Sequence, residues 1–448
     1  MSKILIFGLQ KSGKALFNLL KDKSDVVLYD DNLDIVDDRW TEGKLINMLA
    51  VKESIHTFDL IIYSPSIPQN NWLLVLADEK NIPILNEFEF CFNRCKAKTI
   101  CVTGTDGKTT TAYIMDSILK CSGIKHKLAG NVGIPFSTCC DDLNTEDIAV
   151  LEVSSFMLTG SHLKPDIAIV TNITADHLDW HKDFKEYIKA KANITKHQTE
   201  KDILILNADD EISSFLCWQT NAKTYFFSNQ KKVNGCYSSG NALWLNLEGN
   251  AQKLIDTKEL KIKGNHNKAN AMTAALACYF AGVKVSAIKT GLKNFCGVPH
   301  RLEFVDKIGK ISYINDSKAT TPHAVIAAIK TYNNVSLGLI LGGSDKNLSF
   351  DDIFKAGGVR YYAFTGQTTS ALILSAQKNG IKNYFVCKNL KECVETLSLK
   401  LKKRESVVLL SPACASFDAY KNFVERGNAF KDIVSTRKKV KEIICERK

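Results

Sequence analysis

The segment CVTGTDGKTTT at residues 101–111 combines residue types that can hold a phosphate group. The β-branched, apolar run Thr99 to Thr103 is typical of a buried strand, and Lys108 to Leu119 has helical spacing with a stop near Gly123. A strand, a glycine turn and a helix start present backbone N–H groups and the positive end of the helix to an anion. We therefore expect this loop to bind a nucleoside triphosphate.

Within this loop, two side chains are expected to act directly on the nucleotide. Lys108 would neutralise the β- and γ-phosphates, and the hydroxyl of Thr109 would ligate Mg²⁺. The full set of expected nucleotide contacts in the loop is Gly104, Thr105, Asp106, Gly107, Lys108, Thr109 and Thr110. The general phosphate-loop motif has a further glycine where this chain has Val102, so the match is to the shorter pattern G-x-x-G-K-T. The alternative is a glycine turn that opens a helix and binds no ligand.

Two other polar residues stand where predicted strands end, which is where sites form in α/β domains. Glu152 ends the strand IAVLEV, and its carboxylate suits Mg²⁺, a hard cation that takes oxygen ligands. His177 follows the strand IAIVTNI and is a second candidate metal ligand. The alternatives are a surface glutamate and a structural, hydrogen-bonding histidine.

Strand-like and helical stretches alternate along the 448 residues, which predicts an α/β fold with mainly parallel sheets covered by helices. The length favours about three domains, and we place them at residues 1–93, 94–297 and 298–448. In the first domain, GLQKSG keeps Gly8 and Gly13 of a dinucleotide fingerprint but has Gln10 in place of a glycine, so NAD binding is not expected. Asp30 and Asp31 end the second strand and could bind a ribose or uracil group.

Composition excludes several classes of protein. An apolar fraction of 45% with 24% charged residues is ordinary for a soluble globular protein. The net charge of +11 is not gathered in a basic run interleaved with aromatic residues, which argues against a nucleic-acid groove. The fourteen cysteines form no CxxC pair and no zinc spacing, so we expect buried thiols in a reducing cytosol. The N-terminus reads as a first strand rather than a signal peptide, and no run approaches the roughly 18 apolar residues of a membrane span.

Over nearly its whole length, the chain resembles the Mur ligase family, which joins amino acids to a nucleotide-linked muramic acid. The motifs that carry the resemblance are GTDGKTTT, GNVG, LEVSSF, NITADHLD, KAK, GNHNKANA, GVPHRLE, NDSKAT, GGSDK and SPACASFDAYKNF. Each is weak alone, but their order and spacing are specific. The resemblance implies a Rossmann-like domain for a uridine nucleotide, a central ATPase domain, and a C-terminal Rossmann-like domain that brings in the amino acid.

The last of these motifs resembles the family member that adds D-glutamate to UDP-N-acetylmuramoyl-L-alanine in peptidoglycan precursor synthesis. The implied reaction transfers the γ-phosphoryl group of ATP to the L-alanyl carboxylate, and the amine of D-glutamate then captures the acyl phosphate. The implied setting is a monomer in the bacterial cytoplasm that uses ATP and two Mg²⁺ ions, without a nucleic-acid partner or a membrane span.

The resemblance also assigns roles to single residues. It implies that Lys108, His177 and Lys191 are catalytic, that Lys191 is carbamylated, and that Glu152 shares one Mg²⁺ with Thr109 while His177 contacts the second. Lys189 is the near neighbour at which the register could slip by two residues.

The remaining implied contacts involve ATP and the two substrates. For ATP they are Asn267 and Asn270 at the adenine, Arg301 at the γ-phosphate and Asp316 at the ribose. For the substrates they are Asn131 near the reacting carboxylate and, at D-glutamate, Lys318, Thr320, Lys346, Ser416 and the backbone around Phe423. Asparagine caps and an ordinary surface Arg–Asp pair are the alternatives for the ATP contacts.

Two positions depart from the family pattern, and two other functions stay open. Asn32 stands where the family has an arginine, and Met157 stands after LEVSSF where a glutamine is expected. One alternative is a sister ligase, either another Mur enzyme or a folylpolyglutamate-type synthetase. The other is a phosphate-loop ATPase that moves a partner or a nucleic acid.

Overall fold

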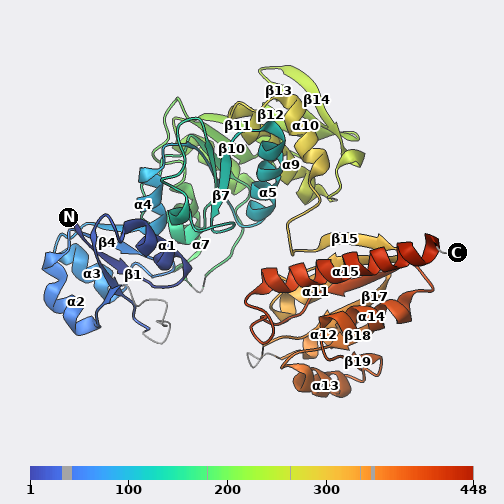
Figure 1. The fold of residues 1–448 in the computed structure, drawn as a ribbon. Coiled ribbons are helices and arrows are strands. Elements are labelled where there is room, and N and C mark those ends of the chain that lie inside the picture. The colour runs from blue at the N-terminus through green and yellow to red at the C-terminus, as the bar shows by residue number, and fades with distance from the viewer. Residues whose placement is uncertain (33–42, 179, 263, 333, 345–348, 447–448) are drawn as a thin grey trace. The chain divides into compact units, whose positions relative to one another are not determined.

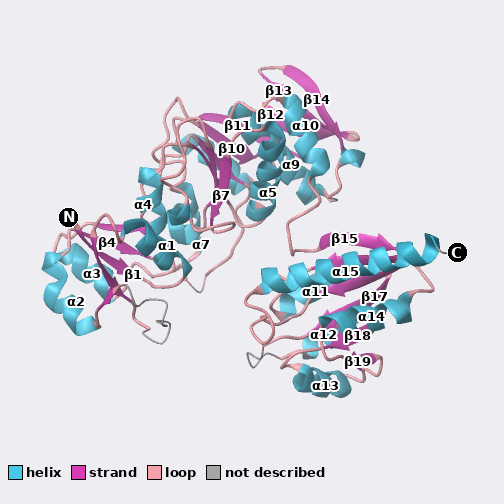
Figure 2. Cartoon of the chain, in the orientation of Figure 1, coloured by secondary structure: helices cyan, strands magenta, loops and turns pink. Residues whose placement is uncertain are grey.

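The computed structural model describes residues 1–32, 43–178, 180–262, 264–332, 334–344 and 349–446 (Figure 1). The chain divides into two compact units, residues 1–295 and 296–448. The first unit contains two separate sheets and the second contains one, and helices flank all three (Figure 2). The predicted α/β class with mainly parallel sheets is confirmed, whereas the division of the first unit at residue 93 stays a prediction.

The first sheet is parallel and has the strand order β3-β2-β1-β4-β5. Alternate residues of β1 pack on opposite faces, with Leu5 in one apolar cluster and Ile6 in the other, so both faces of the sheet are buried. Its strands are β1 (Lys3–Phe7), β2 (Asp25–Tyr29), β3 (Lys44–Leu45), β4 (Leu60–Tyr63) and β5 (Ile84–Asn86). The accompanying helices are α1 (Lys11–Leu20), α2 (Met48–Ser54), α3 (Trp72–Glu79) and α4 (Glu87–Arg94).

The second sheet has the order β14-β13-β12-β11-β10-β9-β6-β8-β7. It is parallel from β7 to β12, and β12, β13 and β14 form an antiparallel extension. The strands are β6 (Lys98–Thr103), β7 (His126–Gly130), β8 (Ile148–Glu152), β9 (Ile167–Val170), β10 (Ile203–Asn207), β11 (Lys223–Ser228), β12 (Gly235–Ser239), β13 (Ala242–Leu247) and β14 (Asn250–Asp256). The helices are α5 (Lys108–Ser122), α6 (Ser155–Leu158), α7 (Phe184–Ala192), α8 (Glu211–Phe215), α9 (Asn265–Phe280) and α10 (Val285–Asn294).

The register of this second sheet sets three strand ends side by side. Val102 of β6 pairs with Glu152 of β8, and Thr103 of β6 pairs with Val170 of β9. The loops that follow β6, β8 and β9 therefore leave the same edge of the sheet at neighbouring positions.

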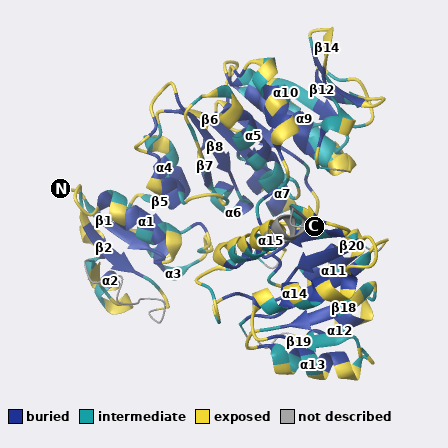
Figure 3. Cartoon of the chain, turned by 45° about the vertical axis from the view of Figure 1, so that its right-hand side comes forward, coloured by how far each residue is buried: buried dark blue, intermediate teal, exposed yellow. Residues whose placement is uncertain are grey.

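The third sheet forms the second unit and has the order β15-β16-β20-β17-β18-β19, parallel except for the pairing of β15 with β16. Strands β17 and β20 are buried almost throughout, whereas the edge strands β15 and β19 carry exposed residues such as Phe304 and Val386 (Figure 3). The strands are β15 (Glu303–Ile308), β16 (Ile311–Asn315), β17 (Ser336–Leu341), β18 (Val359–Phe364), β19 (Tyr384–Val386) and β20 (Ser406–Leu410). The helices are α11 (Pro322–Thr331), α12 (Asp351–Lys355), α13 (Thr369–Lys378), α14 (Leu390–Leu401) and α15 (Phe423–Glu446).

Two further expectations concern the cysteines and the possibility of a membrane-spanning helix. Thirteen cysteines there are free thiols, and most of them are buried, as their apolar sequence context predicted. Across the part of the chain that the structure describes, no helix combines the length and the apolar character that crossing a bilayer would need.

Candidate active site

The phosphate loop joins β6 to α5 through residues 104–107, as the strand–turn–helix pattern predicted. Gly107 caps α5 with a φ of 85°, a left-handed conformation that favours glycine. Gly104 has a φ of 138°, and a Cβ atom there would lie 1.9 Å from the Oγ1 of Thr171. The loop therefore requires glycine at both positions, and it leads into the N-terminus of a helix of 15 residues, where backbone N–H groups can receive an anion.

Residues that follow β9 hold this loop in place. The backbone N–H of Thr105 donates to the carbonyl oxygen of Asn172 at 2.9 Å, and that of Asp106 donates to Asn172 Oδ1 at 2.9 Å. The hydroxyl of Thr171 donates to the carbonyl oxygen of Asp106 at 2.6 Å. Sequence reasoning did not identify Thr171 or Asn172, although two polar residues directly after the buried strand IAIV were a usable signal.

The amine of Lys108 lies over the same loop. Its Nζ donates to the carbonyl oxygens of Gly104 at 2.8 Å and Thr105 at 2.6 Å. Thr109 and Thr110 follow in the first turn of α5 and are half-buried. The lysine and the two threonines therefore lie at the loop and the helix start, and their contacts with phosphate and Mg²⁺ stay a prediction.

Lys191 of α7 also reaches the phosphate loop. Its side chain is buried, its Nζ donates to the carbonyl oxygen of Gly104 at 2.7 Å, and the amine lies 4.5 Å from the centre of the Tyr187 ring. Burial, together with the nearby charge of Lys108, lowers the pKa of Lys191 to about 7. Lys189 is exposed, so Lys191 is the lysine of this helix that contacts the loop.

Glu152 lies at the carboxyl end of β8 and is buried. Its Oε1 accepts a hydrogen bond from Asn131 Nδ2 at 2.7 Å, while its Oε2 is buried without a hydrogen-bond partner among the described residues. An unpartnered buried carboxylate oxygen is costly, and a cation that binds it removes that cost. The donor set fits Mg²⁺, and the amide of Asn131 orients the carboxylate.

His177 lies in the loop after β9, with a φ of 52°. Its side chain is 47% exposed, its ring packs 5.0 Å from that of Phe156, and its Nε2 lies 3.5 Å from Asp176 Oδ2. The ring centre is also 6.5 Å from that of Tyr187, which contacts Lys191. The described residues contain no group of three His, Cys, Asp or Glu side chains that could hold a metal alone. A metal site here therefore needs hydroxyl, substrate or water oxygens in addition.

The two asparagines at the start of α9 contact each other, and Asn270 also contacts α5 just after the phosphate loop. Asn270 Nδ2 donates to Asn267 Oδ1 at 3.4 Å, and Thr111 Oγ1 donates to Asn270 Oδ1 at 3.4 Å. A Cβ atom on Gly107 would lie 2.5 Å from Asn270 Oδ1. The prediction that these two asparagines, three residues apart, share one face at the start of a helix is confirmed.

In the second unit, Asp316 follows β16 and is buried. Its carboxylate accepts from the N–H of Leu302 at 3.1 Å and from the hydroxyl of Ser411 at 2.8 Å, and burial raises its pKa to about 6. Arg301 is exposed. The interpretation of these two residues as an ordinary surface pair is wrong, because Asp316 is not at the surface.

The residues expected at D-glutamate occupy loops of the second unit. Lys318 is exposed and Thr320 is half-buried in the loop after β16. Ser416 is buried, and its hydroxyl has no hydrogen-bond partner among the described residues. Phe423 begins α15, and its carbonyl oxygen accepts from the hydroxyl of Ser317 at 2.8 Å. Lys346 lies outside the described residues.

Sequence reasoning missed Arg426, whose guanidinium is buried close to these loops. It donates to the hydroxyl and the carbonyl oxygen of Ser317 at 3.0 Å each, to the carbonyl of Cys414 at 3.0 Å and to that of Ala415 at 3.2 Å. All of these acceptors are neutral, and burial lowers the pKa of Arg426 to about 10. The loop that carries Ser416 therefore lies beside a buried positive charge, which favours an anion there.

Asp30 and Asp31, which directly follow β2, accept hydrogen bonds from other residues of the first 72 positions. Asp30 accepts from the N–H of Leu9 at 2.7 Å. Asp31 accepts from the hydroxyl of Tyr29 at 2.6 Å, from Asn71 Nδ2 at 2.9 Å and from Trp72 Nε1 at 3.2 Å. These bonds fix the second strand end, where a ribose or uracil contact was expected.

Two family models match the chain: the Mur ligase middle domain over residues 102–278 and the Mur ligase glutamate ligase domain over residues 300–414. A protein of Thermoanaerobacter sp. (strain X514), named UDP-N-acetylmuramoylalanine–D-glutamate ligase, is 37% identical over 446 residues, which cover 97% of this chain and 98% of that protein. This chain belongs to the Mur ligase family.

Other comparisons agree with this membership. A protein of the same name from Streptococcus agalactiae serotype Ia is 33% identical, with 96% of each chain covered. The crystal structure of UDP-N-acetylmuramate-alanine ligase MurC from Thermotoga maritima covers 98% of this Mur ligase and all of that chain, with a TM-score of 0.57 and 18% identity. A structure of UDP-N-acetylmuramoyl-L-alanyl-D-glutamate–2,6-diaminopimelate ligase gives a TM-score of 0.55 at 16% identity and covers 96% and 93% of the two chains. At such identities, these structures show a shared fold and nothing finer.

Proposed function

We propose that this Mur ligase uses ATP to join D-glutamate to UDP-N-acetylmuramoyl-L-alanine. The observation that carries the proposal is the 37% identity, over 97% of the chain, to a relative named for that reaction. The structure supports it with a phosphate loop that is flanked by two lysines and a buried carboxylate. The proposed setting is the bacterial cytoplasm, in peptidoglycan precursor synthesis, and the proposed state is a monomer.

The first chemical step makes an acyl phosphate. An oxygen of the L-alanyl carboxylate bonds to the γ-phosphorus of ATP, and the bond from that phosphorus to the bridging oxygen breaks to release ADP. Every group involved is anionic, so the chain must supply positive charge and positioning. Lys108 and the N–H groups at the start of α5 supply that charge, and the hydrogen bonds that Asp106 makes with Asn172 and Thr171 keep the loop in one shape.

Mg²⁺ would be held at Glu152 and Thr109, with a second ion near His177. Bound there, it would neutralise developing charge on the phosphate oxygens. The support is the unpartnered Oε2 of Glu152 at a strand end beside the phosphate loop. Asn131 fixes the other oxygen of this carboxylate and so determines its orientation.

Lys191 would carry a carbamate. An unprotonated amine is the form that adds CO₂, with loss of one proton, and burial gives Lys191 a substantial unprotonated fraction near neutral pH. The product is an anionic oxygen group, in place of a cation, next to Gly104. A divalent ion nearby would attract this anionic group, whereas it would repel a buried ammonium.

The second step forms the amide bond. The amine nitrogen of D-glutamate attacks the acyl carbon, the tetrahedral intermediate expels inorganic phosphate, and the amine loses a proton. We propose that Ser416, Thr320, Lys318, Lys346 and the backbone around Phe423 bind the two carboxylates of D-glutamate. Arg426 would support this loop with its buried positive charge.

The experiment that tests the function is a phosphate-release assay with the UDP-muramoyl-L-alanine donor and a panel of D- and L-amino acids. The proposal expects ATP-dependent phosphate release and a new amide product with D-glutamate, and neither with L-glutamate. Preference for another amino acid would indicate a sister ligase. ATP hydrolysis without any amide product, stimulated by a polymer, would indicate an ATPase that acts on a partner.

A further inference from the structure

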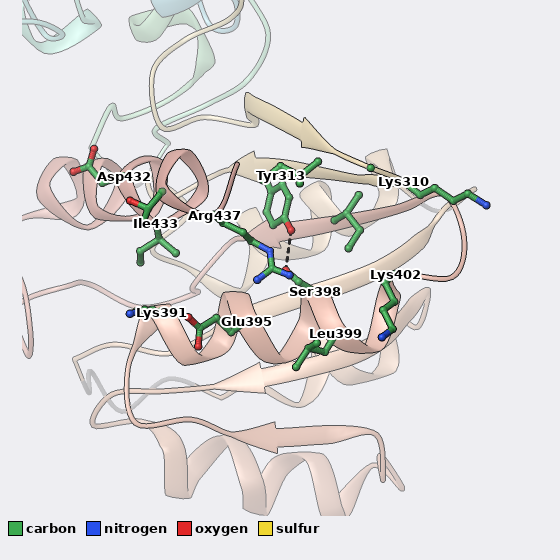
Figure 4. A pocket seen from close by; sticks show the side chains of 14 residues that line it. Lys310, Tyr313, Lys391, Glu395, Ser398, Leu399, Lys402, Asp432, Ile433 and Arg437 are labelled. Atoms are coloured by element: carbon green, nitrogen blue, oxygen red, sulfur yellow. Dashed lines mark hydrogen bonds between the residues drawn. The ribbon is translucent and has the colours of Figure 1, made fainter. Parts of the chain in front are cut away.

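A cavity of about 850 Å³ lies in the second unit, apart from every residue assigned above (Figure 4). Its lining combines β16 and the turn that precedes it, one side of α14 with Lys402 directly after that helix, and the stretch of α15 from Asp432 to Arg437. Cavities of roughly 300–1,000 Å³ are the usual size of small-molecule sites. The cavity includes Ile311 at the amino end of β16, whereas Asp316 and Lys318 follow the carboxyl end of that strand.

The floor of the cavity is apolar. Ile308, Ile311 and Tyr313 are buried there, and Ile433 of α15 is half-buried. Leu399 of α14 also lines the cavity, yet 61% of it is exposed. An apolar ligand would cover this leucine and remove its surface from water.

The two hydroxyl groups at the floor bond to each other rather than offering a donor to a ligand. Ser398 Oγ donates its hydrogen to the carbonyl oxygen of Val394 at 2.5 Å, so Tyr313 must donate in the 2.8 Å bond between the two hydroxyls. These two hydroxyl groups therefore have no hydrogen left for a ligand, and the side-chain donors of the lining are the hydroxyl of Thr436 and the cationic groups.

Arg437 is one of the six charged residues that line the cavity. It is half-buried, and its guanidinium points inward beside Tyr313 and Ser398 (Figure 4). Among the side chains that the structure describes, the ion pairs of α15 are formed by Lys431 and Lys438 and not by Arg437. An arginine in this position offers a planar set of donors that matches a carboxylate or a similar anion.

The other charged residues of the wall increase the positive potential. Cationic side chains outnumber acidic ones four to two in the lining. The cations are Lys310, Lys391, Lys402 and Arg437, and the acids are Glu395 and Asp432.

We propose that this cavity binds a small organic anion with an apolar body. The anionic group would sit on the guanidinium of Arg437, and the hydrocarbon would cover Ile311, Leu399 and Ile433. The excess of cations disfavours a positively charged amphiphile, and the apolar floor disfavours a small inorganic anion. The proposal does not depend on the ligase reaction, because the cavity is a feature of the second unit alone.

Binding to the full chain can be measured with the fluorescent sulfonate 8-anilinonaphthalene-1-sulfonate. We expect saturable binding of one probe per chain and displacement by decanoate, but not by decyltrimethylammonium. Arg437→Gln should weaken binding at least tenfold, whereas Arg404→Gln, an exposed arginine outside the cavity, should leave it unchanged. D-Glutamate with ATP should not displace the probe.

A second pair of variants keeps the test decisive if Arg437→Gln fails to fold. Leu399→Glu places a carboxylate at an exposed position of the cavity wall and should weaken binding at least tenfold. Leu374→Glu is the matched control, since Leu374 of α13 is 68% exposed and does not line the cavity. Equal binding in Leu399→Glu and the unaltered chain, equal displacement by the cationic amphiphile, or displacement by D-glutamate with ATP would overturn the proposal.

Discussion

The amine of Lys191 lies 2.7 Å from the carbonyl oxygen of Gly104, so a buried lysine contacts the backbone of the phosphate loop directly. Lys108 donates to the same carbonyl oxygen at 2.8 Å. Two amines that share one acceptor repel each other, which is one reason why Lys191 gives up its proton more easily than an ordinary lysine. Through the Gly104 carbonyl oxygen, the phosphate loop therefore contacts the lysine that is proposed to carry a carbamate.

Replacing Lys191 by alanine should reduce turnover at least 1,000-fold, because the proposed carbamate is lost while the loop glycines stay in place. Added short carboxylates such as acetate or formate should restore part of the activity by supplying an anionic oxygen group. Steady-state kinetics measure both effects. Lys189→Ala is the matched control, since Lys189 is an exposed lysine on the same helix. Full activity of Lys191→Ala would refute the carbamate.

Lys191 should also make stability depend on pH in metal-free, CO₂-free buffer. Its pKa is about 7 in the folded chain, against about 10.4 for an exposed lysine, so the unfolded state binds more protons between these values. The free energy of unfolding of the native chain should therefore rise with pH from about 7 to about 10, relative to Lys191→Met, by up to about 4 kcal/mol. Below pH 7 the difference should be constant. Urea unfolding at several pH values measures it, and a difference that does not change with pH would mean that the amine keeps its proton.

Glu152→Gln should lower turnover at least 100-fold and raise the Mg²⁺ concentration needed for half-maximal activity. The amide keeps the shape of the side chain but removes the negative charge whose Oε2 lacks a partner. Asn131→Ala should also lower turnover and raise the Mg²⁺ requirement, but by less, because it only frees the carboxylate of Glu152 to rotate. A Mg²⁺ titration of both variants distinguishes the two roles. An unchanged Mg²⁺ requirement in Glu152→Gln would remove this carboxylate from the metal site.

Gly104→Ala should abolish ATP binding, and we expect it to lower the free energy of unfolding by about 2 kcal/mol or more. The added Cβ would lie 1.9 Å from Thr171 Oγ1, and the φ of 138° disfavours any other residue. Gly123→Ala tests the conformational effect alone, since its φ is 74° and nothing lies within 4 Å of the added atom. Nucleotide titration and chemical unfolding give the two readouts. Normal ATP affinity in Gly104→Ala would contradict the loop geometry.

Ser416→Ala should not lower the free energy of unfolding and should raise it by about 1 kcal/mol, because the buried hydroxyl makes no hydrogen bond among the described residues. It should nevertheless raise the KM for D-glutamate about tenfold or more, as expected when a hydrogen bond to a carboxylate is lost. The KM for ATP should change little. If both KM values rose equally, Ser416 would not be an amino-acid contact.

The phosphate loop could be predicted because the residues that form it are neighbours in the sequence. A strand, two glycines and a helix start follow one another within about 20 residues, and the structure has β6, the loop and α5 in that order. The alternation of strands and helices likewise sufficed for the α/β class.

Residues that act through distant contacts could not be predicted in the same way. Periodicity does not distinguish Lys191 from Lys189, and only the packing of α7 buries one and exposes the other. Arg426 contacts Ser317, which lies 109 residues earlier in the chain, and no spacing in the sequence signals that contact. The lone Oε2 of Glu152 is a property of its three-dimensional surroundings as well.

The most direct test of the ligase reaction follows an oxygen atom. UDP-N-acetylmuramoyl-L-alanine labelled with ¹⁸O in its alanyl carboxylate is turned over with ATP and D-glutamate, and the released phosphate is analysed by mass spectrometry. Phosphorylation of the carboxylate followed by attack of the amine transfers one labelled oxygen to each phosphate and leaves the other in the new amide. That is the predicted result. Unlabelled phosphate, or labelled donor recovered without an amide bond to D-glutamate, would contradict it.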